Sequence, residues 1–476
     1  MRDHSRKIDN KFLIIIEDRS QINELLAQAE QRKAVEASIE VISMNRNVND
    51  ELQRLHVKSK TLDDYGLSEE YLEEEGMKWF KSFPSIKIRN GKDIKELLAY
   101  NGISIWWLLD EVLYRSPYLF KQLQATIKHL IAFEYIVKVE KPSRIYYINN
   151  DSCVSKVLDF VCREKSIRTA KAASSPGIRQ ALSNWIKVKI FQYGPLLHML
   201  VRKVYWIILT QIHPRVKKIT KNARLLMFLG DHLRDVHDPT TGKIKKGDLY
   251  FDSVLDLLRK DYDVVSVGHP TIIWSISIIK EQMQNPGVIY YPFENYLSIK
   301  VLMKAVQAAI KIHKIYQHLA KTSAFQQSLN LYGIPVYDLI KQKLALFFSS
   351  SFLLRIVAYI EMVNNLVATE RPNAILLGDG ATADRALIAV AKGNGIPTIV
   401  TMHGYALTPY VPRFNHIADD IGPRFEATSP YCPMADKYIV YGEYDKDMMI
   451  RRAMYPEEDI IIGVPRYDIL AKADKL

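Results

Sequence analysis

The stretch 373–405 constrains the fold of this chain more than any other part of its sequence. An apolar run at 374–377 predicts a buried strand, and the glycines within 378–380 predict a turn directly after it. Apolar side chains at helical spacing follow over 383–392, and a second apolar run at 397–401 predicts another strand. Two strands joined by a crossover helix run parallel, so the loops that follow them meet at one edge of a sheet.

At this edge the sequence places two side chains suited to acid–base chemistry. Asp379 follows the first strand, and His403 follows the second. A neutral imidazole can take a proton from an acceptor hydroxyl because its pKa lies near neutrality. The neighbouring Gly380 and Gly404 allow a substrate to approach closely. The alternative is that these side chains only hydrogen-bond their own loops, but the sequence favours a catalytic role for His403, with Asp379 beside it.

Two more histidines follow apolar strands. His232 comes after a strand expected at 225–229, and His269 comes after one expected at 264–267. If all these strands are parallel, both histidines lie at the same edge as His403 and are candidates for substrate binding. The stretch 231–238 also contains Asp and His side chains of the types that bind metals. Its spacing matches no known ligand pattern, so we favour a polar or substrate-binding loop and expect no metal.

Three further candidates for substrate binding lie near the end of the chain. Glu443 follows a strand expected at 437–441, and Arg466 and Asp468 follow one expected at 459–462. Arg466 is suited either to bind a phosphate or to pair with Asp468 in a turn. The Asp-x-Asp at 445–447 has the form of a metal site in some nucleotide-sugar enzymes, but the start of a helix explains it better. The sequence contains neither a P-loop nor a dinucleotide-binding fingerprint.

The positive charge of the chain is concentrated in one segment. The 476 residues carry a net charge of +12, but 165–230 contain 13 Lys or Arg and no Asp or Glu, which leaves 52 basic and 53 acidic residues elsewhere. The apolar share of 48% and the charged share of 25% are typical of a globular protein, and the length suggests two or three domains. The three cysteines form neither a metal-binding spacing nor a disulfide framework, which favours a reducing, cytoplasmic compartment.

The basic segment mixes its positive charges with aromatic side chains. Arg202 and Lys203 interrupt its most apolar run, so no window reaches the roughly 18–20 uninterrupted apolar residues that a spanning helix needs. A basic helix with aromatic residues favours contact with an anionic membrane surface. A pair of core helices with a solvated basic rim is the first alternative. Nucleic-acid binding is the second and least favoured, because no recognised binding motif is present.

Two parts of the chain share one pattern. At 140–151 and at 370–379, a long helix ends in Glu-Lys/Arg-Pro, and an apolar strand, a polar loop and a helix follow. This pattern indicates an internal repeat of an α/β unit. The alternative is that any Rossmann-like crossover has the same appearance.

Three motifs, in this order along the chain, carry a resemblance to known families. They are Gly395-Ile396-Pro397-Thr398 leading to Met402-His403-Gly404, then 435–443, then Gly463-Val464-Pro465-Arg466-Tyr467-Asp468. Over about 370–470 the chain resembles GT-B enzymes of surface-polysaccharide synthesis, especially the CDP-glycerol glycerophosphotransferase and capsule-polysaccharide transferase families. The resemblance implies a nucleotide-activated donor and implies that His403 is the catalytic base.

The chain departs from those families in one respect. Their second Rossmann-like domain, which holds the donor nucleotide, follows the Gly-x-Pro motif, whereas only 469–476 follow it here. The chain is then a fragment, or the donor half is a separate polypeptide, or the first 165 residues serve as the second lobe. The expected domains are an N-terminal α/β domain at 1–165, a basic helical insertion at 166–223 and a Rossmann-like domain at 224–476.

The sequence as a whole predicts an α/β protein with Rossmann-like parallel sheets and flanking helices, GT-B-like, with a basic helical insertion. We expect a glycosyltransferase or polyol-phosphate transferase that moves a group from a nucleotide-activated donor to a glycan or lipid-linked acceptor. It would lie at the inner face of the plasma membrane, with 166–223 on the anionic surface, and would need no cofactor and no nucleic acid. The alternatives are a GT-B-like nucleotide-sugar epimerase and a non-catalytic subunit that lacks the donor domain.

Overall fold

The computed structural model describes most of the chain, and the structural statements below refer to these residues. They are 11–33, 38–82, 85–106, 108, 120–149, 152–173, 178–212, 223–229, 233–237, 244–248, 251–268, 289–378, 382–401, 435–451 and 455–463. The chain forms two compact units, and neither is a contiguous piece of sequence. Unit 1 consists of Met1–Phe83, Ser116–Lys187 and Gln326–Leu344, and unit 2 consists of Pro84–Arg115, Val188–Phe325 and Ala345–Leu476.

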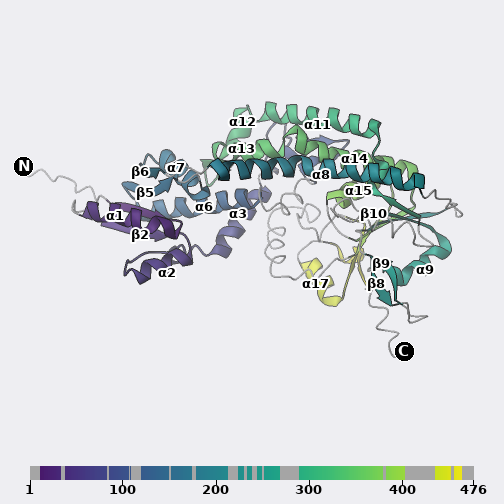
Figure 1. Cartoon of the computed structure of the whole chain (residues 1–476), viewed down its shortest axis with the longest axis horizontal. Coiled ribbons are helices and arrows are strands. Elements are labelled where there is room, and N and C mark those ends of the chain that lie inside the picture. Colours follow the sequence, from purple (N-terminus) through teal and green to yellow (C-terminus); the bar gives the residue numbers. More distant parts are fainter. Residues whose placement is uncertain are drawn as a thin grey trace, which may run out of the picture. The chain divides into compact units, whose positions relative to one another are not determined.

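A sheet of four parallel strands forms the centre of unit 1 (Figure 1). In spatial order the strands are β2 (Ser38–Ser43), β1 (Lys11–Ile16), β5 (Arg144–Asn149) and β6 (Arg168–Ala173). The four side chains from Leu13 to Ile16 are each at most 2% exposed, as expected for a parallel strand that is covered on both faces. The helices of this unit include α1 (Ile22–Lys33), α2 (Arg46–Arg54), α3 (Glu69–Ser82), α6 (Phe120–Glu140) and α7 (Cys153–Glu164).

A sheet of seven parallel strands forms the centre of unit 2. In spatial order they are β11 (Ile289–Pro292), β10 (Asp263–Gly268), β7 (Arg224–Leu229), β14 (Ala374–Leu377), β15 (Thr398–Thr401), β16 (Lys437–Val440) and β17 (Ile460–Ile462). Its helices include α9 (Asp252–Asp261), α11 (Ile299–Leu319), α14 (Ser350–Glu370), α15 (Thr382–Gly393), α17 (Glu443–Arg451) and α8 (Ile178–Ile212) from Val188 onward. Parallel sheets with flanking helices confirm the predicted α/β, Rossmann-like class.

The basic segment expected to be a helical insertion at 166–223 is helical in α8, but its first part forms β6. That strand pairs with β5 and completes the sheet of unit 1. The stretch 243–247 contains three lysines and a glycine, a composition typical of a turn. This stretch lies mostly in β9 (Ile244–Asp248), which pairs antiparallel with β8 (Leu233–His237), and this pairing outweighs the low strand preference of lysine and glycine.

The internal repeat is visible in the pairing of the strands. The order β2-β1-β5-β6 in unit 1 corresponds to β10-β7-β14-β15 in unit 2. The register also corresponds. In unit 1, Phe12, the second residue of β1, faces Arg144, the first residue of β5. In unit 2, Leu225, the second residue of β7, faces Ala374, the first residue of β14. A generic crossover does not require identical registers, so the repeat extends to the level of single residues.

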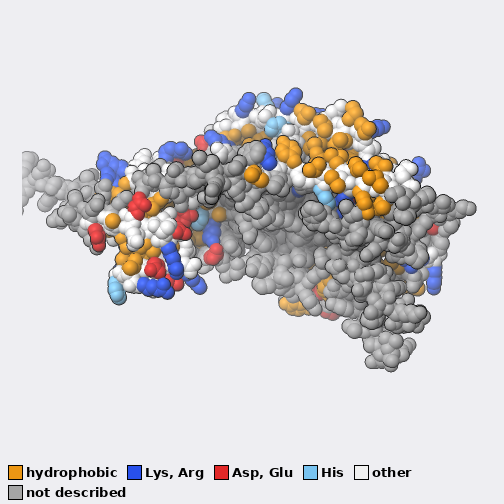
Figure 2. Space-filling model, in the orientation of Figure 1, with side chains coloured by type: hydrophobic (Ala, Val, Ile, Leu, Met, Phe, Trp, Pro, Cys, Tyr) orange, Lys and Arg blue, Asp and Glu red, His pale blue; other side chains and the backbone are white. Residues whose placement is uncertain are grey.

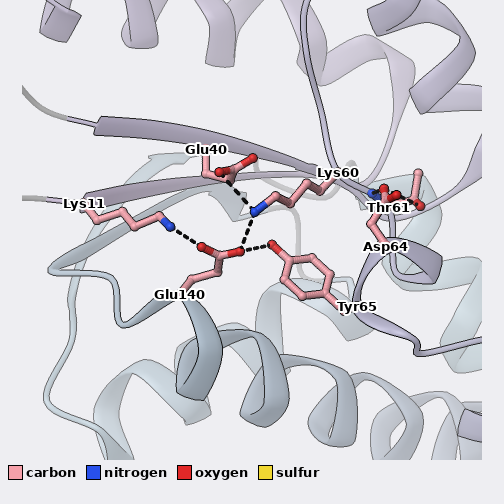
Figure 3. Close-up of polar contacts among 7 residues, drawn as sticks. All are labelled: Lys11, Glu40, Lys60, Thr61, Asp64, Tyr65 and Glu140. Atoms are coloured by element: carbon pink, nitrogen blue, oxygen red, sulfur yellow. Dashed lines mark hydrogen bonds and ion pairs between the residues drawn. The ribbon is translucent and has the colours of Figure 1, made fainter.

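A glutamate at the equivalent position in each repeat binds the amino end of its sheet. Glu140, the last residue of α6, accepts hydrogen bonds from Lys11 at the start of β1, from Lys60 Nζ at 2.8 Å and from Tyr65 Oη at 2.6 Å (Figure 3). Burial alone would raise the pKa of Glu140, but hydrogen bonds from the two lysines and the tyrosine lower this pKa to about 2. The carboxylate is therefore held ionised within the fold.

Glu370 repeats this arrangement in unit 2. It is the last residue of α14, and it contacts Nη1 of Arg224, the first residue of β7, at 3.3 Å. Tyr296 Oη donates to its other carboxylate oxygen at 2.9 Å. The residue after each glutamate, Lys141 or Arg371, has a φ of 47°, so both helices end in the same left-handed turn.

Each repeat also contains a short hairpin. The hairpin from the first half of the sequence belongs to unit 2, and the hairpin from the second half belongs to unit 1. The strands β3 (Ala99–Tyr100) and β4 (Ile103–Ser104) belong to unit 2, where Tyr100 Oη donates to Glu361 Oε1 on α14 at 2.8 Å. The strands β12 (Asn330–Leu331) and β13 (Ile334–Pro335) belong to unit 1, where Trp79 Nε1 donates to the carbonyl of Asn330 at 2.6 Å. The expected domain ranges were contiguous, whereas each unit takes its hairpin from the other half of the sequence.

Within the described residues, α14 is the one helix whose length and apolar composition would allow it to cross a membrane. In unit 2, 67% of its most apolar window is buried. Its neighbours include α11 and α15, which pack against it (Figure 1). The helix is therefore accounted for as a core element of unit 2.

Candidate active site

The carboxyl edge of the seven-stranded sheet is the framework of the candidate site. Four neighbouring strands, β10, β7, β14 and β15, are parallel and lie side by side in that order. In the sequence they are followed by His269, His232, Asp379 and His403, respectively. The chain leaves β7 toward β10 on one side and leaves β14 toward β15 on the other, so the topological switch point lies between β7 and β14. Open α/β sheets bind their ligands at this kind of position.

The spacing of the strands shows which of the predicted site residues follow strands whose ends lie close together. Neighbouring strands lie about 4.8 Å apart, so the ends of β14 and β15 are close enough for their loops to share one reacting group. The ends of β10 and β15 are three intervals apart, or about 14 Å. Residues following β14 and β15 therefore suit the reacting centre, whereas a residue following β10 suits a more distant part of a substrate.

Most of the predicted site residues lie outside the described part of the chain. They are Asp379, Gly380, His403, Gly404, His232, His269, Arg466 and Asp468. The structure describes the strands that precede them, and their roles stay predictions. Glu443 is described: it is the first residue of α17 and is exposed, directly beyond the carboxyl end of β16.

Two buried charges near this edge were missed by sequence reasoning. Asp384 and Arg385 lie in the first turn of α15, which begins just after the loop that contains Asp379, and they are 1% and 0% exposed. Burying a charge is costly unless it has a partner, so two buried charged side chains in the first turn indicate that the start of α15 is held in a defined position. The sequence contained this signal, an Asp-Arg pair within an otherwise apolar helix.

The Asp-x-Asp at 445–447 also differs from its expected role. Helix α17 begins at Glu443, so Asp445 is the third residue of the helix instead of its cap. Asp445 is 4% exposed, and burial raises the pKa of its carboxyl. Lys446 between the two aspartates pairs with Glu457 at 2.8 Å. Among the described residues, no group of three His, Cys, Asp or Glu side chains is arranged to hold a metal ion.

Unit 1 has an equivalent edge, and the structure describes more of it. Its switch point lies between β1 and β5, where Glu17 accepts a hydrogen bond from Ser152 Oγ, the N-cap of α7, at 2.6 Å. Asn45 Nδ2 donates to the Glu17 carbonyl at 2.8 Å, and Arg19 Nε donates to the carbonyl of Asn47 at 3.1 Å. The exposed Arg19 guanidinium is suited to a phosphate group at this edge. The sequence alone assigns no role to this loop.

Comparison with known proteins finds similar solved structures but no matching family model. No family model and no curated protein matches the sequence. Two solved structures that resemble the chain are UDP-GlcNAc 2-epimerases. One, from Neisseria meningitidis and bound to UDP-GlcNAc, has 10% identity and a TM-score of 0.22 over 98% of both chains. The other, from Methanocaldococcus jannaschii, has 10% identity and a TM-score of 0.20 over 98% of this chain and 92% of that chain. Similarity at this level supports no conclusion about the reaction.

Proposed function

We propose that this protein transfers a sugar or polyol phosphate from a nucleotide-activated donor to a glycan or lipid-linked acceptor in surface-polysaccharide synthesis. The observation that carries the proposal is the order of the strands in unit 2. Two residues of the catalytic type, Asp379 and His403, follow adjacent parallel strands beside a topological switch point. The repeat in unit 1 supports it further, because a second α/β unit is available within the same chain for the donor.

In this proposal His403 is the general base that takes the proton of the acceptor hydroxyl. Asp379 orients the imidazole or binds the acceptor, and Gly380 and Gly404 leave room for it. His232 and His269 contact the acceptor farther along the edge. Glu443, Arg466 and Asp468 lie on the donor side, where a guanidinium suits a phosphate. The reaction takes place at the inner face of the plasma membrane, where lipid-linked acceptors are found.

The second candidate function is that of a nucleotide-sugar epimerase. It is the class of the two solved structures named above. An epimerase needs the nucleotide sugar alone, whereas a transferase releases its nucleotide only when an acceptor takes the transferred group. Product analysis with and without a membrane acceptor fraction separates the two: an epimerised nucleotide sugar without acceptor favours the epimerase.

The first experiment is calorimetric titration of the full chain with CDP, UDP, GDP and CMP. We expect micromolar binding of one nucleotide, and the absence of binding to all four would contradict a donor site in this chain. Arg19→Ala tests unit 1 as the donor unit, with the exposed Arg54→Ala on α2 as its matched control. A loss of affinity in Arg19→Ala alone assigns the donor phosphate to the edge of unit 1.

The proposed role of His403 as the general base is tested separately. We expect His403→Ala to abolish turnover while nucleotide affinity and the circular dichroism spectrum stay at wild-type values. The control is His318→Ala, which removes an exposed histidine from α11. Unchanged turnover in His403→Ala would remove this residue from the mechanism.

A further inference from the structure

Helix α8 is apolar on two opposite sides. Its inner face within unit 2 is formed by Met199, Arg202, Trp206 and Leu209, each at most 7% exposed. Its outer face is formed by large apolar side chains that are 39–63% exposed: Tyr193, Leu197, Leu200, Val201, Val204, Ile207 and Ile208. A surface helix of a globular domain usually turns polar residues to water. The outer face of α8 is therefore an exposed apolar surface.

Specific polar contacts fix which side of α8 faces outward. Arg202 Nε lies 3.0 Å from Glu294 Oε1, and both side chains are at most 3% exposed. Trp206 Nε1 donates to Asn295 Oδ1 at 3.0 Å, and Lys203 Nζ donates to the Asn295 carbonyl at 2.8 Å. These partners belong to the turn η4 (Phe293–Tyr296), which directly precedes α11. Rotation of α8 about its axis would break these contacts, so its outer face stays exposed.

Helix α11 presents a second apolar stripe. Its inner side packs against α14, whereas Ile299, Met303, Val306 and Ile310 are 79%, 57%, 38% and 44% exposed. Their spacing of four, three and four residues places them on one face of the helix. Figure 2 shows hydrophobic side chains gathered on one face of the molecule over the positions of α11 and α8 in Figure 1.

The charges that α8 and α11 themselves carry have one sign. Neither α8 nor α11 contains an Asp or Glu residue. Four exposed lysines, Lys300, Lys304, Lys311 and Lys314, lie along α11. Lys304 pairs with Glu361 of α14 at 3.5 Å. Apolar stripes flanked by lysines, on helices that carry no carboxylate of their own, are complementary to a surface that is apolar inside and anionic outside.

We propose that the outer faces of α8 and α11 together form a docking face for an anionic lipid bilayer. The apolar stripes would enter the headgroup region, and the lysines would contact the lipid phosphates. A second copy of the chain is disfavoured as the occupant because two faces of the same positive charge repel each other. The docking face deepens the proposed function by placing the enzyme beside lipid-linked acceptors, but its test needs no turnover.

The experiment is co-sedimentation of the full chain with two kinds of vesicle. One kind contains phosphatidylcholine alone, and the other contains phosphatidylcholine with about 30% phosphatidylglycerol. We expect binding to the anionic vesicles to be at least about tenfold tighter and to weaken with salt. Leu197→Glu on α8 and Met303→Glu on α11 should each weaken it at least about tenfold. Replacing Lys300 and Lys311 together by glutamine should weaken it by about 30-fold on anionic vesicles.

The matched control is Leu257→Glu on α9 of the same unit, a leucine that is 60% exposed and lies outside the docking face. It should bind vesicles within about twofold of wild type. The proposal is overturned if the wild-type chain does not bind anionic vesicles or if Met303→Glu binds them like wild type. It is also overturned if Leu257→Glu weakens vesicle binding as much as Met303→Glu does. Sedimentation velocity without lipid adds one more outcome: a dimer that Leu197→Glu dissociates, without vesicle binding, would assign the face to a second copy. Nucleotide titration is independent of all these results, so the docking face and the proposed function can fail separately.

Discussion

Replacing Glu140 with glutamine would test the carboxylate that closes the amino end of the sheet in unit 1. The side chain is 4% exposed and is held by two lysines and a tyrosine. Glutamine keeps the size of the side chain but removes its charge. Lys11 and Lys60 would then face a neutral amide, and part of their burial would no longer be compensated.

The magnitude follows from the pKa of Glu140. Burial opposes ionisation, but the hydrogen bonds from Lys11, Lys60 and Tyr65 prevail and lower the pKa from 4.5 to about 2. At about 1.4 kcal/mol for each pH unit, this difference corresponds to about 3 kcal/mol of folding free energy at neutral pH. Because the folded-state pKa is the lower one, the contribution is complete above about pH 4.5 and is lost as the pH falls toward 2.

The assay is urea unfolding, followed by circular dichroism, at several pH values from 7 down to 3. We expect Glu140→Gln to be less stable by about 3 kcal/mol at pH 7, with the difference shrinking below pH 4.5. The control is Glu69→Gln, since Glu69 pairs with Lys128 on the surface of the same unit and its side chain is 76% exposed. An exposed pair of this kind is worth at most about 1 kcal/mol. Equal stability of Glu140→Gln and wild type at pH 7, or a difference that does not change with pH, would refute the reasoning.

Three other substitutions follow from the same structure. Arg202→Ala removes the buried partner of Glu294 and should cost about 3–5 kcal/mol in thermal or urea unfolding, and a loss below about 1 kcal/mol would show that the pair is not held as described. Ser166 and Gly395 both follow the helix after the repeated strand and have φ values of 55° and 69°. Ser166→Gly should therefore stabilise the chain by about 0.5–1 kcal/mol, and Gly395→Ala should destabilise it by about 1 kcal/mol. Both are measured by urea unfolding. Shifts of the opposite sign would contradict the left-handed backbone at these positions.

Much of the fold could be predicted from local patterns. The apolar runs at 12–16, 225–229 and 374–377 became central parallel strands because a strand buried on both faces needs such a run. The shared Glu-Lys/Arg-Pro segments indicated the repeat for a physical reason as well. The glutamate binds the cation at the start of the neighbouring strand, and the next residue turns the chain into the sheet.

Other features could not be read from the sequence. The hairpins at 99–104 and 330–335 have the same local pattern whichever sheet they join, so no periodicity reveals that the units exchange them. The outer stripe of α11 was missed because an amphipathic helix with several apolar residues predicts burial, and only the packing shows that Met303 stays exposed. The arrangement of Asp379 and His403 depends on loops outside the described residues, so sequence and strand order together carry that prediction.

The exchanged hairpins affect the synthesis of the protein on the ribosome. When a nascent chain has been made as far as Lys187, unit 1 still lacks Gln326–Leu344, which supplies the carbonyl partner of Trp79. Roughly 140 further residues separate the two segments, and at 5–20 residues per second their translation takes about 7 to 30 seconds. During that time α3 lacks the hydrogen bonds that Trp79 and Glu75 make with this segment, so an N-terminal fragment ending near Lys187 should be prone to aggregation and to capture by chaperones. Unit 1 can complete its fold only after translation has passed Leu344, which lies well into the second half of the chain.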